Sequence, residues 1–108
     1  MLKLALVLGL LSIGCGGGSS GATCPTTSTL TYDNFGRRFF ASYCDRCHAM
    51  GTQPPFMTLA QIHADTTAID SVAAAGASAI NTSMPQDGTV PTEAERRQLG
   101  EWLACGAR

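Results

Sequence analysis

The chain has 108 residues, with seven basic and eight acidic side chains and a formal net charge of −1. It contains no run of basic residues, so the charge pattern excludes nucleic acid as an expected partner. Without an N-terminal leader about 80 residues remain, and so small a core is marginal unless disulfides, a metal or a cofactor adds to it.

The first 14 residues, MLKLALVLGLLSIG, are a lysine near the start of an apolar run that closes on small residues. This pattern is typical of a secretory signal peptide, and the run is short for a permanent membrane span. The residues before Cys15 resemble the lipobox at which bacterial lipoproteins are cleaved and acylated, although Ser12 stands where leucine is usual. We therefore expect a lipid on Cys15 and a place in the periplasm or at the cell surface. Simple cleavage and release is the alternative.

Glycine and serine dominate the stretch after Cys15, which reads GGGSSGAT over residues 16–23. Because this stretch has no large apolar side chain, residues 15–29 are predicted to form a flexible tether. Residues 30–108 are expected to form one domain without internal repeats.

The first helix is predicted over residues 31–43, where aromatic side chains recur at steps of three and four residues. Thr31 can cap its first turn. Gly36 lies on the same stripe, where the cost of glycine in a helix suggests that another segment comes close.

Two short helices follow, at residues 58–64 and 68–75, and the first of them begins with a capping box of Thr58 and Gln61. Residues 50–56 and 76–91 contain proline and glycine without a sustained period, which predicts loops.

Thr92 and Glu95 form another capping box, which opens a last helix that ends at Cys105 and Gly106. No segment alternates as a strand does, so the predicted fold class is all-α.

The motif CDRCH, at residues 44–48, places Cys44 and Cys47 in CxxC spacing with His48 directly after them. This spacing suits a redox dithiol, part of a zinc site or covalent haem attachment. A redox dithiol normally lies beside a strand in a βαβ unit, and no strand is predicted in this chain. A zinc site needs four ligands, and beyond the motif only His63 and distant cysteines are available. We therefore expect one haem c, joined to Cys44 and Cys47 by thioether bonds, with its iron bound by His48.

Each of the five cysteines of an exported chain needs an assigned role, because an oxidising compartment favours disulfides over free thiols. With Cys15 assigned to lipid and the CDRCH cysteines to haem, Cys24 and Cys105 remain at opposite ends of the helical domain. We expect these two to pair. The alternative is that each is only a linker or terminal residue.

Gly36, Phe40 and Cys44 follow one another at four-residue steps, and Trp102 lies in the last predicted helix. The same arrangement occurs in small monohaem c-type cytochromes of the class I type, which residues 30–104 resemble. In that family the aromatic residue of the last helix packs on the glycine of the first. The resemblance implies that the N- and C-terminal helices pack together while short helices and loops wrap the haem.

Met84 lies in the loop before the last helix, where this family places a methionine that binds the iron. Pro85 biases Met84 towards an extended backbone, so its side chain projects from the loop. The resemblance thus implies that His48 and Met84 are the two axial ligands, and His63 is the alternative to Met84.

Met50 and Met57 are expected to fill the core. By analogy with the family, the carbonyl of Pro54 or of Pro55 is expected to accept the other ring proton of His48, and the sequence leaves both prolines open.

The resemblance implies a monomeric electron carrier that exchanges electrons with redox partner proteins and touches a membrane only through its lipid. The alternative is an enzyme or sensor, a haem peroxidase or a gas or redox sensor whose sixth iron position opens. Met84 would block that position, and no arginine and histidine pair for peroxide activation is evident.

Overall fold

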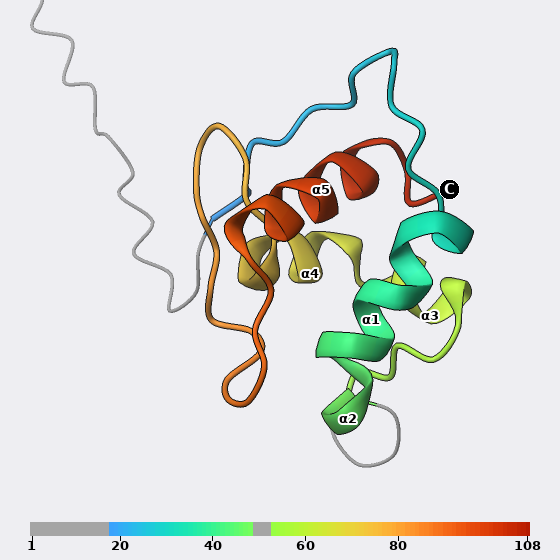
Figure 1. Ribbon diagram of the computed structural model, residues 1–108, viewed down its shortest axis with the longest axis vertical. Coiled ribbons are helices and arrows are strands. Elements are labelled where there is room, and N and C mark those ends of the chain that lie inside the picture. Colours follow the sequence, from blue (N-terminus) through green and yellow to red (C-terminus); the bar gives the residue numbers. More distant parts are fainter. Residues whose placement is uncertain (1–17, 49–52) are drawn as a thin grey trace, which may run out of the picture.

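The computed structural model describes residues 18–48 and 53–108, which fold into helices joined by loops (Figure 1). In chain order these are η1 (Tyr32–Gly36), α1 (Arg37–Tyr43), α2 (Asp45–His48), α3 (Leu59–Ala64), α4 (Thr66–Ala73) and α5 (Glu93–Ala104). These two ranges contain no strand, and their β structure is limited to an isolated bridge between Ala75 and Ile80. The all-α class is therefore confirmed for them. None of their helices is long and apolar enough to cross a membrane.

Three of the helices begin at threonines that the sequence marked as caps. Thr31, Thr58 and Thr92 each accept a hydrogen bond from the backbone of the third helical residue, whose side chain bonds back to the threonine N–H. These reciprocal bonds satisfy two donors that a helix start otherwise leaves unpaired. Two details differ from the prediction, since the first helix opens with a π-helical turn and α4 begins at Thr66.

The buried core joins η1 and α1 to α5 and also includes side chains of α3 and α4, among them Ile62 and Ile69. The indole of Trp102 is fully buried and lies directly against Gly36. The rings of Tyr32, Phe35 and Phe40 surround it, with centroids 6.5, 6.1 and 6.3 Å from the indole. The N- and C-terminal helices therefore pack together through Trp102 and Gly36.

Replacing Gly36 by alanine is expected to destabilise the protein, because the new Cβ would lie 2.6 Å from Cζ2 of Trp102. Overpacking of this kind costs about 1–3 kcal/mol, which outweighs the gain of about 1 kcal/mol in helix propensity. Denaturant unfolding measures the effect. Gly18→Ala is the control, because nothing lies within 4 Å of its added Cβ. A Gly36→Ala variant as stable as this control would contradict the close contact.

Parts of residues 18–29 are fastened to the helices, at Ser20 and at Cys24, whereas the sequence predicted a flexible tether over residues 15–29. Ser20 is only 1% exposed, and its N and Oγ donate to the carboxylate of Asp70 in α4 at 2.7 and 2.6 Å. Small residues permit this close packing, since a Cβ added to Gly100 of α5 would lie 2.8 Å from the Cβ of Ala22. The signal peptide at 1–14 and the lipid site at Cys15 lie outside the described residues.

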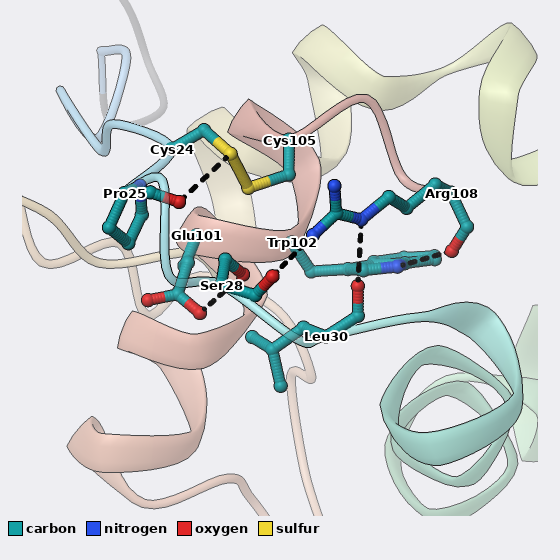
Figure 2. The surroundings of a disulfide bond; sticks show 8 residues. All are labelled: Cys24, Pro25, Ser28, Leu30, Glu101, Trp102, Cys105 and Arg108. Atoms are coloured by element: carbon teal, nitrogen blue, oxygen red, sulfur yellow. Dashed lines mark hydrogen bonds between the residues drawn. A yellow bond between two sulfur atoms is a disulfide. The ribbon is translucent and has the colours of Figure 1, made fainter.

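A disulfide joins Cys24 to Cys105, with 4.8 Å between the Cα atoms, as the cysteine count predicted (Figure 2). Beside it Ser28 Oγ donates to the carboxylate of Glu101 at 2.9 Å, and the guanidinium of Arg108 donates to the carbonyl of Ser28 at 2.5 Å. These bonds fasten the N-terminal segment, α5 and the C-terminal residue to one another. Figure 1 shows the segment running alongside α5 before it enters η1.

Candidate functional site

A cavity of about 340 Å³ lies among α1, α2, α4 and the loop that follows α4. Its size falls within the range of small-molecule and cofactor pockets. Much of its wall is apolar, formed by residues such as Phe39, Phe40, Phe56, Ile69, Val72 and Ala73. Cys44, Cys47, His48 and Met84, the four residues that the sequence analysis assigned to haem, all line this cavity.

The CDRCH motif forms a turn and a short helix at the end of α1. The N–H groups of Cys47 and His48 donate to the carbonyl of Cys44 at 3.2 and 3.0 Å. Cys44 is half-buried, Cys47 is exposed, and the disulfide uses neither of them. The tight turn thus presents two thiols and an imidazole to the same cavity.

The carbonyl of Pro54 orients the imidazole of His48, since His48 Nδ1 lies 2.8 Å from Pro54 O. A carbonyl only accepts, so Nδ1 carries a ring proton, and Nε2 is the ring nitrogen that remains for a metal. Histidines that bind metals commonly use this arrangement. Of the two prolines left open by the sequence, the structure therefore selects Pro54.

Met84 reaches the cavity from the loop after α4. Its N–H donates to the carbonyl of Val72 at 3.0 Å, its carbonyl accepts from Nη1 of Arg96 at 2.8 Å, and its half-buried side chain packs against the core. Met57, by contrast, is 54% exposed, so its prediction as core filler is wrong. It lies in the loop that precedes the cap of α3 and not on the buried face of that helix. Met50 lies outside the described residues.

His63 does not line the cavity. Its Nε2 donates to the carbonyl of Ala107 at 2.7 Å, and Ala107 is fully buried. His63 thus joins α3 to the C-terminal residues, and its geometry gives no support to the alternative of His63 as an iron ligand.

Carboxyl groups beside the cavity have shifted pKa values. The hydroxyl of Tyr43 donates to Glu95 at 2.7 Å, which lowers the pKa of Glu95 and raises that of Tyr43. This bond joins the end of α1 to the start of α5. Burial raises the pKa of Asp45, against an opposing effect of His48, and Asp45 Oδ1 is buried without a hydrogen-bond partner among the described residues.

No group of three or more His, Cys, Asp and Glu side chains in residues 18–48 and 53–108 could hold a metal ion. A haem iron with histidine and methionine ligands takes only one such side chain from the protein. Comparison with known proteins gives no match to a family model, to a curated protein or to a solved structure.

Arg96 was not recognised from the sequence as part of this site. It is 3% exposed, although arginine is usually found at the surface. Arg96, Leu99 and Leu103 recur at steps of three and four residues in α5, so the helical period already places Arg96 on the apolar face. A charged residue on the apolar face of a helix was therefore the feature of the sequence that could have identified Arg96.

Proposed function

We propose that this protein is an exported electron carrier that holds one covalently attached haem in the cavity. The observation that carries the proposal is the gathering of Cys44, Cys47, His48 and Met84 on one largely apolar cavity, although Met84 is far from the motif in sequence. These are the groups that such a haem needs, and each is of the required chemical type.

The residues fit the group in three respects. Cys44 and Cys47 supply two thiols, one for each vinyl group of a haem, and they lie one helical turn apart. Nε2 of His48 is the ring nitrogen that remains for an iron, because Nδ1 is committed to Pro54. Apolar side chains on the wall would cover a porphyrin and exclude water. When bound, this haem would supply one-electron chemistry between ferric and ferrous iron.

Two protein ligands distinguish a carrier from an enzyme. His48 and Met84 would together supply two protein ligands to the iron, which would leave no position for a substrate. The thioether of Met84 is a soft ligand that favours the ferrous state. The proline carbonyl would hold the imidazole in one orientation and strengthen its donation.

Electron exchange with a partner protein requires that one edge of the bound haem lie near the protein surface. Exposed residues at the cavity, among them Cys47, Gln53 and Gln86, would bring that edge within reach of a redox partner protein outside the cytoplasm. A lipid on Cys15 would keep the carrier at a membrane.

Mass spectrometry of the protein, exported from cells able to mature c-type cytochromes, tests the proposal. We expect the added mass of one haem on the peptide that contains Cys44 and Cys47. The Cys44→Ser/Cys47→Ser double variant is the control and should lack this mass. An exported wild-type chain without the added mass would contradict the proposal.

A further inference from the structure

Arg96 is a buried cation that gathers three backbone carbonyls with one nitrogen. Its Nη1 donates to Ala73 O at 3.0 Å, to Asn81 O at 3.1 Å and to Met84 O at 2.8 Å. The first carbonyl ends α4, and the other two belong to the loop that carries Met84. Arg96 itself is in α5, so one side chain joins two helices and the loop.

A contribution to fold stability alone does not explain why an arginine is buried at this position. None of the three acceptors is a carboxylate, and Arg96 forms no ion pair with the residues that the structure describes. Desolvation by burial lowers the pKa of the Arg96 guanidinium. Arginine nevertheless stays charged in proteins, so its burial costs free energy. Apolar residues in place of buried charges often leave a fold equally stable or more stable.

The loop forms further backbone hydrogen bonds, and these do not use the Met84 carbonyl that accepts from Arg96. The N–H groups of Asn81 and Met84 donate to Ala74 and Val72, each at 3.0 Å. These two bonds tie the loop to the end of α4. In residues 18–48 and 53–108, the bond from the Arg96 guanidinium is the hydrogen bond that joins Met84 to α5.

We propose that Arg96 is a positioning residue for Met84 and that its buried charge raises the reduction potential of the site. The inference rests on the proposed function, in which Met84 binds the iron. Hydrogen bonds from a charged donor are stronger than neutral ones, so the guanidinium holds the backbone of Met84, a residue of the cavity wall. Arg96 Nη1 lies 2.8 Å from the Met84 carbonyl, and a fixed positive charge beside the ligand residue would favour the state with one more electron, because charge attraction is strong in a medium of low dielectric constant.

Two variants of the haem-loaded protein separate position from charge. Arg96→Lys keeps the charge and loses the planar fork of donors, whereas Arg96→Gln loses the charge and keeps one amide donor group. We expect Arg96→Gln to lower the reduction potential and Arg96→Lys to keep it nearer to that of the wild type. In Arg96→Lys the ferric absorption band from sulfur bound to iron should disappear at a lower temperature than in the wild type. Amide hydrogen exchange at Met84 should accelerate about tenfold or more in both variants.

Arg97→Gln is the matched control, because Arg97 is the next residue of α5 and is exposed, with an ion pair to Glu93 at 3.2 Å. It should leave the potential, the sulfur band and the exchange at Met84 unchanged. If folded Arg96→Gln and Arg96→Lys behave like Arg97→Gln, the inference is overturned. If Arg96→Gln does not fold, Arg96→Lys alone tests the positioning role. A sulfur band as heat-stable as that of the wild type, with unchanged amide hydrogen exchange at Met84, would then overturn it.

Failure of the proposed function gives a different result. A wild-type chain without haem would overturn the proposed function itself. A Met84→Ala variant that keeps the sulfur band would show that another group binds the iron, and the role of Arg96 in positioning the ligand would fall with that assignment. A different set of results would overturn only the role of Arg96. In that case the wild type carries haem, Met84→Ala loses the sulfur band, and both Arg96 variants keep the band and the reduction potential of the wild type.

Discussion

In the proposed haem-loaded protein, replacing Met84 by alanine is expected to abolish the ferric absorption band of sulfur bound to iron and to let the reduced form bind carbon monoxide. The methyl group of alanine cannot reach an iron, so the sixth position would be left open to water or a small gas. Loss of the soft thioether should also lower the reduction potential, because that ligand favours the ferrous state. Visible spectra with and without carbon monoxide, together with a redox titration, measure both effects.

Met57→Ala is the matched control for this prediction. Met57 is 54% exposed and is not among the residues of the cavity wall. We expect this variant to keep the sulfur band, the potential and the resistance to carbon monoxide. A Met84→Ala variant that behaves in the same way would show that another group binds the iron.

Removal of the disulfide, by the double substitution Cys24→Ser/Cys105→Ser, is expected to cause a large loss of stability. The bond spans 81 residues of sequence, and the chain-entropy model assigns about 4 kcal/mol to a loop of this length. Small domains have a net stability of only about 5–15 kcal/mol, so the variant should unfold at a much lower denaturant concentration. Equilibrium unfolding followed by circular dichroism measures the change.

The control for the disulfide is Ser28→Ala, which removes one hydrogen bond to Glu101 close to the same sulfur atoms. This change should cost about 1 kcal/mol. Equal unfolding midpoints for the two variants would mean that the covalent link adds nothing beyond the contacts around it.

The helix starts were predictable because their signals are local. A capping box lies within four consecutive residues, so Thr31, Thr58 and Thr92 could be recognised without knowledge of the fold. The pairing of Cys24 with Cys105 could be inferred because the other cysteines had assigned roles. The short spacing of CDRCH likewise predicted that its thiols and imidazole lie together.

Long-range contacts of small or charged residues were not predictable. Ser20 belongs to a stretch with the composition of a tether, and its burial depends on Asp70, which is 50 residues away. Arg96 is buried because carbonyls of a distant loop converge on it, and a loop without a periodic pattern gives no sign of this. The choice of Pro54 over Pro55 depends on the path of the loop relative to His48.

The docking of residues 18–29 limits how far an anchored molecule could travel. Cys15 lies only five residues before Ser20, and five residues span at most about 18 Å even when fully extended. A lipid on Cys15 would therefore hold the body of the protein against the bilayer surface, with the face around Ser20 and Asp70 turned to the head groups. Redox partners of the proposed carrier would then have to meet it at the membrane surface.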